Sequence, residues 1–326
     1  MIKKRIFITG ISGQDGSYLS EYMLELGHEV HGFIRRHSEG GDRIKRICHL
    51  HNRLHLYYGD MIDSYSLEVA VETAKPDYVF HLAAQTHVRI SFDTPEHTID
   101  VNGMGTLRLL EACKRICPKA HIYNAASSEL FGSRIDDDGF QRETTPITPA
   151  SPYGIGKAMA YHLVSHYRRA YKMYAVSGIL FNHESPKRGA DFVSQKIIKG
   201  AHDIYRGFTD KLELGNIDSH RDWGHAKDYV RAMWLIMNHI EPMDFVIATG
   251  ETHTVRNMCE VVFGYFGLDY KDYVVQNPKF MRPEEIPYLK GDAIKARVIL
   301  GWEPTYTFET LLHEMIEYHV KDRENV

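Results

Sequence analysis

A turn with three glycines follows the first apolar stretch of the chain, and it limits the possible folds more than any other segment. Residues 6–9 (IFIT) lead directly into Gly10, Gly13 and Gly16, where a helical pattern begins. Glycines at this spacing allow a tight turn, a close approach of the backbone to a pyrophosphate, and close packing of helix on strand. The helix N-terminus adds positive potential for the phosphates. The segment therefore predicts a dinucleotide-binding βαβ unit at the start of the chain.

Short apolar runs alternate with helical patterns beyond this turn, which is typical of a parallel sheet. We predict strands at 6–9, 29–34, 54–59, 78–83, 121–126 and 174–181. We predict helices near 16–26, 65–74, 97–116, 152–171, 191–206, 224–239, 254–266 and 307–320. The expected fold is α/β, a doubly wound parallel Rossmann sheet with a smaller, mixed C-terminal substrate domain. The expected division is 1–181 with 224–250 for the dinucleotide, and 182–223 with 251–326 for the substrate.

Composition excludes several other classes of protein. The 326 residues carry 39 Lys and Arg against 43 Asp and Glu, a net charge of -4, which gives no electrostatic reason to bind nucleic acid. No apolar run approaches the ~20 residues of a membrane helix, and the N-terminal stretch is expected to be a strand and not a signal peptide. The four cysteines form no disulfide framework, which favours a cytoplasmic location. His49, His51 and His55 lie close together without a Cys or acidic ligand nearby, so we expect no metal site.

The end of the second strand indicates which dinucleotide is bound. NAD sites usually have an acidic residue there for the ribose 2′-hydroxyl. This chain instead has Arg35 and Arg36, followed by Arg43 and Arg46. Guanidinium groups suit a 2′-phosphate, so the sequence favours NADP. The alternative is a solvated basic loop.

A second motif supplies groups for proton transfer. Ser151 and Pro152 can begin a helix that carries Tyr153 and Lys157 on one face. A nearby ammonium favours phenolate, so we expect Lys157 to lower the pKa of Tyr153 and prepare it to act as a base. Residues 126–132 (ASSELFG) leave the fifth strand and add the Ser127 hydroxyl and the Glu129 carboxylate, unless Glu129 is an exposed loop acid.

These motifs occur within longer blocks that resemble the extended short-chain dehydrogenase/reductases, and among them the GDP-mannose 4,6-dehydratase family. The resemblance runs nearly end to end, through TGISGQDGSYL, EVHGFIRR, LAAQTHV, SFDTPEHT, NGMGTLRLLEA, SSELFG, SPYGIGK, ILFNHESPKRG, DSHRDWGHAKDYV, DFVIATG and the RPEE…LKGD…A…LGW tail. It implies NADP that is tightly bound and recycled without net redox change. It also implies a GDP-sugar as substrate.

The resemblance implies a role for each catalytic candidate. Tyr153 takes the proton of the sugar 4-hydroxyl, and Lys157 keeps the tyrosine pKa low. Glu129 removes the C5 proton as water leaves C6, and Ser127 orients and helps to protonate. A 4-reductase or an epimerase performs no elimination and needs no carboxylate at position 129.

The resemblance also implies binding residues. The cofactor set comprises Thr9, Gly10, Gly13, Gln14, Asp15, Gly16, Arg35, Arg36, Asp60, Met61, Leu82, Ala83, Ala84, Tyr153, Lys157, Leu180, His183 and Arg188. The set for the GDP portion comprises Asn182, Lys196, Arg221, Arg282 and Glu285. The loop from Arg35 to Arg43 resembles a segment that reaches a neighbouring subunit's cofactor, which implies a homodimer or homotetramer.

Three departures from the family pattern keep alternatives open. Ser127 stands where the family usually has Thr, with Ala126 before it in place of Ser. The tail has Glu285, Ile286, Pro287 and Tyr288 in place of an acidic-aliphatic stretch, and the basic loop is shortened. The substrate is then GDP-mannose or, alternatively, a GDP-manno-heptose. A 4-reductase or epimerase, or a non-catalytic NADP-sensing protein, are the remaining interpretations.

Overall fold

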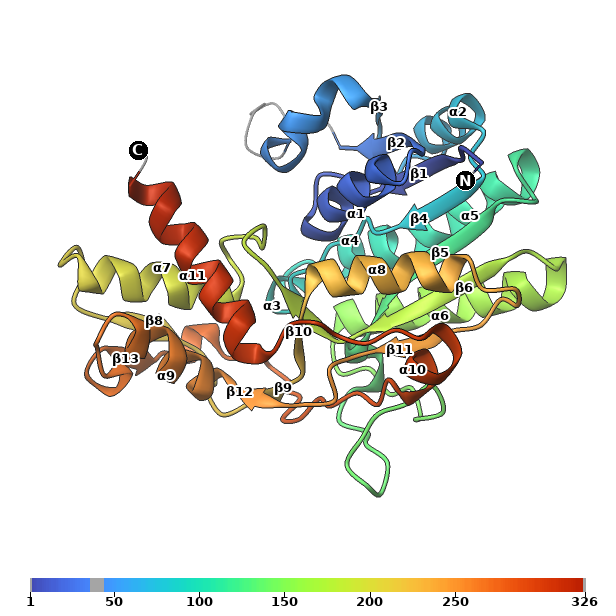
Figure 1. The fold of residues 1–326 in the computed structure, drawn as a ribbon. Coiled ribbons are helices and arrows are strands. Elements are labelled where there is room, and N and C mark those ends of the chain that lie inside the picture. Colours follow the sequence, from blue (N-terminus) through green and yellow to red (C-terminus); the bar gives the residue numbers. More distant parts are fainter. Residues whose placement is uncertain (1, 36–43, 325–326) are drawn as a thin grey trace.

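The computed structural model describes residues 2–35 and 44–324. Arg36 and Arg43 therefore lie outside the described residues. A seven-stranded sheet occupies one side of the molecule in Figure 1, and the other side contains α7 (Val193–Tyr205), α9 (Val255–Tyr265) and α11 (Phe308–Glu324). Among the described residues, no helix has the length and apolar character to cross a membrane.

The sheet is parallel throughout, in the order β11-β6-β5-β4-β1-β2-β3. The order confirms the predicted doubly wound fold, because the chain moves outward from β1 to β3 and then returns to β4 on the other side. All six predicted strands are present, and β11 joins them as a seventh that we did not predict. The strands are β1 (Arg5–Thr9), β2 (Glu29–Ile34), β3 (Leu54–Tyr58), β4 (Tyr78–His81), β5 (His121–Ser127), β6 (Ala175–Leu180) and β11 (Phe245–Ile247).

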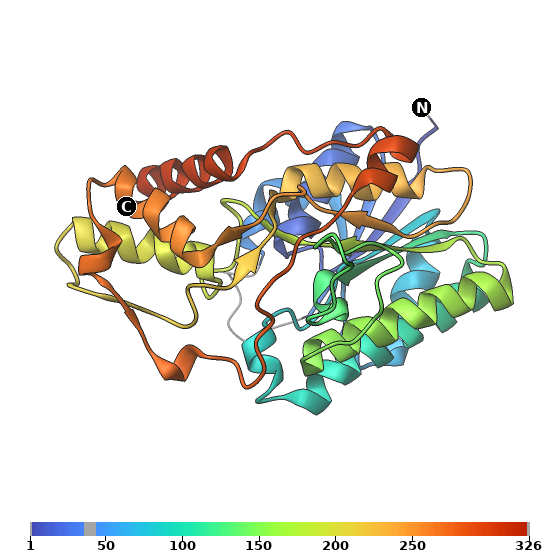
Figure 2. The same ribbon diagram turned by 90° about the horizontal axis from the view of Figure 1, so that it is seen from below.

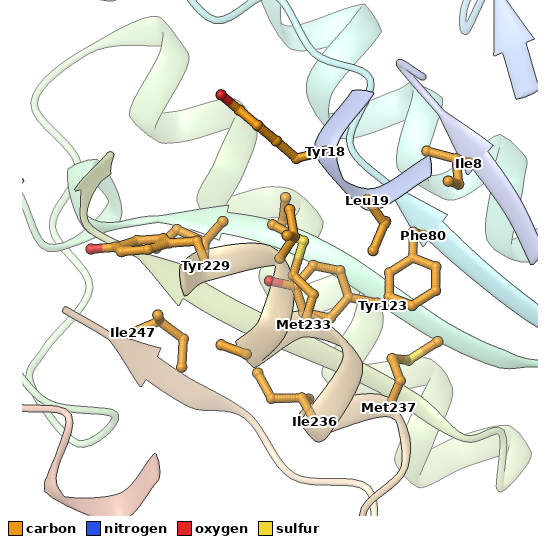
Figure 3. Close-up of a cluster of buried hydrophobic side chains, with 14 of the residues drawn as sticks. Ile8, Tyr18, Leu19, Phe80, Tyr123, Tyr229, Met233, Ile236, Met237 and Ile247 are labelled. Carbon is orange, nitrogen blue, oxygen red and sulfur yellow. The ribbon is translucent and has the colours of Figure 1, made fainter. Parts of the chain in front are cut away.

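Helices cover both faces of this sheet. On one face α1 (Gln14–Glu25) packs beside α8 (Ala226–Met237), and on the other α2 (Ser64–Ala74), α5 (Gly105–Ile116) and α6 (Pro152–Tyr171) lie in a row. Figure 2 shows the gold α8 above the sheet and the green α6 below it. Figure 3 shows the first interface, where Leu19, Met233 and Ile236 meet Phe80 and Tyr123 of the strands. Burial on both faces explains why β1, β4 and β6 are mostly apolar in the sequence, whereas the edge strand β3 is only partly buried.

The predicted helix at 97–116 is not continuous. It is divided into α4 (Pro95–Ile99), a π-helical turn over Asp100–Met104, and α5. A Cβ atom at Gly103 would lie 2.5 Å from the sulfur of Met159, so the glycine allows this turn to approach α6 closely.

The second half of the chain builds a separate apolar cluster from α7 (Val193–Tyr205), α9 (Val255–Tyr265) and α11 (Phe308–Glu324). Its strands form three short pairs: β7 (Asn182–Glu184) with β10 (Trp223–His225), β8 (Leu212–Leu214) with β13 (Val274–Gln276), and β9 (His220–Arg221) with β12 (His253–Thr254). The remaining elements are α3 (Val88–Ser91), α10 (Ile294–Leu300), and 3-10 helices over Lys45–Arg53, Ser128–Phe131, Tyr270–Asp272 and Pro278–Phe280.

Candidate functional site

Two cavities lie beside each other at the carboxyl ends of the sheet strands. One, of about 410 Å³, extends over the glycine turn and the ends of β2 and β3. The other, of about 340 Å³, lies between β5, α6 and the C-terminal cluster. Leu82 and Thr86 line both, so the two cavities are neighbours. Ligands of open α/β sheets bind at this edge, where the strand order reverses.

The glycine turn forms the floor of the first cavity. Gly10 has φ +72°, and a Cβ atom there would lie 2.8 Å from the backbone nitrogen of Ala83. A Cβ atom at Gly16 would lie 2.4 Å from the carbonyl oxygen of Gly10. The backbone at both positions therefore excludes any side chain, and Gly13 leaves the surface of the cavity open to a pyrophosphate. These residues fit a bound dinucleotide.

Most residues of the predicted cofactor set line the cavities. Gly10, Gly13, Arg35, Asp60, Met61, Leu82, Ala83 and Ala84 line the first cavity. Asp15, Tyr153, Lys157, Leu180, His183 and Arg188 line the second.

Thr9, Gln14 and Gly16 line neither cavity and instead support the turn. The Thr9 hydroxyl is fully buried and accepts hydrogen bonds from the backbone nitrogens of Leu82 and Ala83 at 3.2 and 3.1 Å. Gln14 donates to Asp15 and to the carbonyl oxygen of His183. The motif predicted that these residues bind the cofactor. The side chains of Thr9 and Gln14 are instead buried and form hydrogen bonds with neighbouring protein groups.

The basic groups after β2 lie at the rim of the first cavity. Arg35 Nη1 is 4.0 Å from Asp60 Oδ2. Arg46 also lines this cavity and donates from Nε to the carbonyl oxygen of Lys187 at 2.7 Å. Two guanidinium groups therefore line the cavity near the end of β2.

An ion pair connects the glycine turn to β7. His183 Nε2 lies 2.9 Å from Asp15 Oδ2, and its Nδ1 lies 2.8 Å from the carbonyl oxygen of Phe181. Both partners are acceptors, so both ring nitrogens donate and His183 is protonated. Burial opposes both charges, but the pairing raises the pKa of His183 and lowers the pKa of Asp15.

Tyr153, Lys157 and Ser127 meet at the floor of the second cavity. The Ser151 hydroxyl accepts from the backbone nitrogen of Gly154 at 3.0 Å and begins α6, which places Tyr153 and Lys157 one turn apart. Lys157 Nζ lies 6.0 Å from the centre of the Tyr153 ring and donates to the carbonyl oxygen of Ala125 at 2.7 Å.

The pKa of Tyr153 moves in the direction opposite to our prediction. Burial raises the pKa of Tyr153 to about 12, and a hydrogen bond with Ser127 opposes this rise. Burial also lowers the pKa of Lys157 to about 8. Spacing on a helix face reveals the neighbouring ammonium but not the loss of solvent around both groups, and the loss of solvent dominates here.

Glu129 is a buried carboxylate within a chain of charged groups. It lies in the 3-10 helix that follows β5, and its side chain is 9% exposed, so the interpretation as an exposed loop acid is wrong. Arg282 Nη1 donates to Glu129 Oε1 at 3.2 Å and lies 3.7 Å from Glu285 Oε1. Arg221 donates to the same oxygen of Glu285 at 3.0 Å. The two arginines and two glutamates therefore alternate along one wall of the cavity.

All five residues predicted to bind the GDP portion line this second cavity: Asn182, Lys196, Arg221, Arg282 and Glu285. Lys196 Nζ lies 3.6 Å from the centre of the Phe280 ring, and Arg188 lies 3.6 Å from that of Phe192. Cationic groups and aromatic faces suit a nucleoside diphosphate, because phosphates bind the cations and a base can stack on a ring.

The cavities also include residues that we did not predict. Ser12 and Thr86 line the first cavity, and His87 and Arg89 line the second. Ser12 is part of the glycine turn, and Thr86 and His87 lie in the loop that leaves the carboxyl end of β4, so these positions were the available signal. Phe192 and Phe280 also line the second cavity, but no sequence pattern distinguishes them, because aromatic residues are spread throughout the chain.

Comparison with known proteins adds to this geometry. The family described as GDP-mannose 4,6 dehydratase matches residues 7–315. The chain is 47% identical to GDP-mannose 4,6 dehydratase 1 of Arabidopsis thaliana over 327 residues, covering 97% of this chain and 89% of the relative. It is 45% identical to GDP-mannose 4,6 dehydratase of Homo sapiens over 339 residues, covering 96% and 91%.

Solved structures share the fold over almost the whole chain. UDP-glucose 4-epimerase of Thermus thermophilus, in complex with NAD, superposes with a TM-score of 0.84 at 25% identity, covering 96% of this chain and 98% of that one. RMD of Pseudomonas aeruginosa, complexed with NADPH, gives 0.80 at 23% identity, covering 98% and 100%. Both of those proteins hold a nicotinamide dinucleotide.

Proposed function

Because this chain belongs to the GDP-mannose 4,6-dehydratase family, we propose that it removes water from GDP-mannose to give GDP-4-keto-6-deoxy-mannose, as a hydro-lyase. The observation that carries this proposal is the buried Glu129 carboxylate beside the Tyr153 and Ser127 hydroxyls in one cavity. A ketone at C4 makes the C5 proton acidic, and a carboxylate is the group that can remove it.

A bound nicotinamide dinucleotide would supply the redox chemistry, as acceptor of a hydride from C4 and donor of the hydride at C6. The residues of the chain handle the protons. Tyr153 reacts as the phenolate, which the hydrogen bond with Ser127 favours, and becomes a neutral phenol when it accepts the proton of the 4-hydroxyl. Glu129 removes the C5 proton and passes it to the C6 hydroxyl, which leaves as water, and Tyr153 returns the proton of the 4-hydroxyl to C5 once C6 is reduced. One water is lost and no net oxidation occurs.

Burial assists these transfers. Tyr153 and Lys157 are 9% and 5% exposed, so bulk water has little access to the groups that move protons. The Lys157 ammonium is fixed by the Ala125 carbonyl, one helical turn from the phenol that must carry negative charge. A fixed charge in a site of low polarity acts more strongly than it does in water.

We propose that the dinucleotide is NADP and that Arg35 and Arg46 bind its 2′-phosphate. Both guanidinium groups line the first cavity at the end of β2. Residues 1–181 with 224–250 would hold this cofactor, and 182–223 with 251–326 the nucleotide sugar. Within the second set, α10 packs on β11 and α8 and so lies with the sheet. A homodimer or homotetramer and a cytoplasmic location complete the proposal.

No specific observation favours the alternatives. The relatives reported above are named for GDP-mannose, which gives no support to a heptose donor. The buried carboxylate at position 129 would be without a task in a 4-reductase or an epimerase. A non-catalytic protein would have no need of the Tyr153 and Lys157 pair.

Mass spectrometry of GDP-mannose after incubation with the purified protein, without added reductant, tests the proposal. The expected product is lighter by one water, with no net change in NADPH absorbance. A GDP-manno-heptose incubated in parallel separates the two donors. Unchanged GDP-mannose, from folded protein with NADP bound, would contradict the proposed substrate.

A further inference from the structure

Glu29, His31 and His55 form a cluster away from both cavities. Glu29 and His31 are two residues apart on β2, so their side chains lie on the same face of the sheet. In the parallel register His31 pairs with His55 of β3, which puts the third side chain on that face as well. The cluster lies toward the amino ends of these strands, whereas the dinucleotide cavity begins only at Phe33.

The distances within the cluster suit a tetrahedral metal ion. His31 Nε2 lies 3.2 Å from Glu29 Oε1, and His55 Nε2 lies 3.4 Å from the same oxygen. One potential ligand atom from each of the three side chains lies within 4.8 Å of the others. Ligands bonded to zinc at ~2.0–2.1 Å are separated by roughly 3.3 Å in a tetrahedron. We propose that Glu29, His31 and His55 form a zinc-binding site that joins β2 to β3.

Tyr57 provides the outer support that metal-binding histidines usually have. Its hydroxyl lies 3.0 Å from His31 Nδ1, and the two rings are stacked. With Nδ1–H donating to this hydroxyl, His31 Nε2 presents a lone pair toward Glu29. An outer partner of this kind fixes both the tautomer and the orientation of the ring.

The three proposed ligands differ in their exposure to solvent, and this difference leaves a path by which an ion can enter. His31 is 5% exposed and rigidly held, whereas the His55 side chain is 57% exposed and open to solvent. An ion can therefore enter from the His55 side, and water can complete its coordination. Two imidazoles and one carboxylate suit zinc, since calcium and magnesium prefer oxygen ligands alone.

Other charged groups also face the cluster. Lys3 Nζ lies 3.2 Å from Glu29 Oε2 and leaves Oε1 to the histidines. Arg5 and His55 also act electrostatically on His31. The competing arrangement is a hydrogen-bonded cluster in which the two histidines donate to Glu29 without any ion.

The sequence did not predict this site. We expected no metal near His49, His51 and His55, because no acidic ligand stands close to them in the chain. The structure separates these histidines: His49 pairs with Glu21 at 2.7 Å, and His55 meets Glu29 of the neighbouring strand. Pairing of β2 with β3 brings the missing carboxylate to His55.

Zinc titration of the full-length, chelator-treated protein tests the inference, with a chromophoric chelator as competitor and elemental analysis for stoichiometry. Wild type is expected to bind one zinc ion per chain. His55→Gln, at an exposed position, should lower the affinity more than roughly 100-fold, and Tyr57→Phe by about 10- to 100-fold. His49→Ala is the control, because it removes an exposed histidine that pairs with a glutamate outside the proposed site. This variant should bind zinc with the same affinity as wild type.

Circular dichroism and thermal unfolding verify that each variant is folded. Zinc should raise the unfolding temperature of wild type and of His49→Ala but not of His55→Gln. No stoichiometric zinc in wild type, or equal affinity in folded His55→Gln, would overturn the proposal in favour of the hydrogen-bonded cluster. Dehydration of GDP-mannose by the chelator-treated enzyme is measured in parallel and should be unchanged, so this result stands apart from the proposed function.

Discussion

The Nη1 atom of Arg282 lies 3.2 Å from Oε1 of Glu129, although 153 positions separate the two residues in the chain. The other carboxylate oxygen, Oε2, is buried and has no hydrogen-bond partner among the described residues. Arg282 therefore holds one oxygen in place and leaves the second available to take a proton. The geometry suits a general base better than a binding group.

Glu129→Gln should lower the rate of water loss by roughly 10²–10⁴-fold, the usual contribution of a positioned base, while binding of the dinucleotide is retained. Mass spectrometry of the product and fluorescence titration with NADPH measure the two effects.

Glu285→Gln is the matched control, because Glu285 lines the same cavity and also contacts Arg282. It should raise KM for GDP-mannose and change kcat little. Wild-type turnover in Glu129→Gln would remove Glu129 from the mechanism.

Tyr153→Phe should reduce kcat far more than Ser127→Ala, because in the proposed mechanism the Tyr153 phenolate takes the substrate proton and Ser127 only assists. We expect a loss of roughly 10²-fold or more for Tyr153→Phe, and a smaller one for Ser127→Ala. Tyr161→Phe on the same helix is the control, since burial also raises the pKa of Tyr161 to about 12 but this residue does not line the cavity. Steady-state kinetics with all three variants give the order, and the reverse order would mean that the base is misassigned.

Arg35→Ala should weaken NADPH binding more than NADH binding. Loss of a charge-assisted hydrogen bond costs about 1.5–3 kcal/mol, or roughly 10- to 150-fold in Kd. Arg53→Ala, an exposed arginine that lines neither cavity, should affect neither dinucleotide. Equal losses for NADPH and NADH in Arg35→Ala would contradict the assignment to the 2′-phosphate.

Gly132→Ala should disturb the segment that carries Glu129. Gly132 ends the 3-10 helix at φ +57°, and a Cβ atom there would lie 1.9 Å from the carbonyl oxygen of Thr148. We expect the free energy of unfolding to fall by about 1–3 kcal/mol because of the backbone conformation, and by about 1–3 kcal/mol more because of the clash. The control is Gly139→Ala, which also has positive φ but has no atom within 4 Å of its Cβ and should show the first cost alone. Urea unfolding measures both, and equal costs would mean that the Thr148 loop yields freely.

Glu314 should make the protein sensitive to acid. The His225 ring and Lys227 hold the pKa of Glu314 at about 2, well below its ordinary 4.5. The carboxylate therefore stabilises the folded state fully above pH 4.5, and this stabilisation is lost as the pH falls toward 2. Glu314→Gln should cost about 1 kcal/mol at pH 7, since the pair is partly exposed, and should flatten the dependence of stability on pH in that window. Denaturant unfolding at a series of pH values from acid to neutral measures this dependence. If the free energy of unfolding of Glu314→Gln changes with pH as it does in wild type, Glu314 is not the source of the acid sensitivity.

The sequence determined the features of this protein that depend on residues close together in the chain. Gly10, Gly13 and Gly16 predict the nucleotide turn, and the apolar runs predict six strands, because strand, turn and helix preferences act over a few residues. The spacing of Tyr153 and Lys157 likewise placed both groups on one helix face.

Tertiary structure decided what depends on burial and on contacts between distant segments. It brought Arg282 to Glu129 and Glu29 to His55, and no local pattern records which strands and loops become neighbours. It also reversed the expected shift of the Tyr153 pKa, since the removal of water from a phenol outweighs the effect of a nearby charge. Local preferences thus determine the helices and strands, whereas tertiary packing, which excludes solvent, determines the pKa values and the contacts of the site residues.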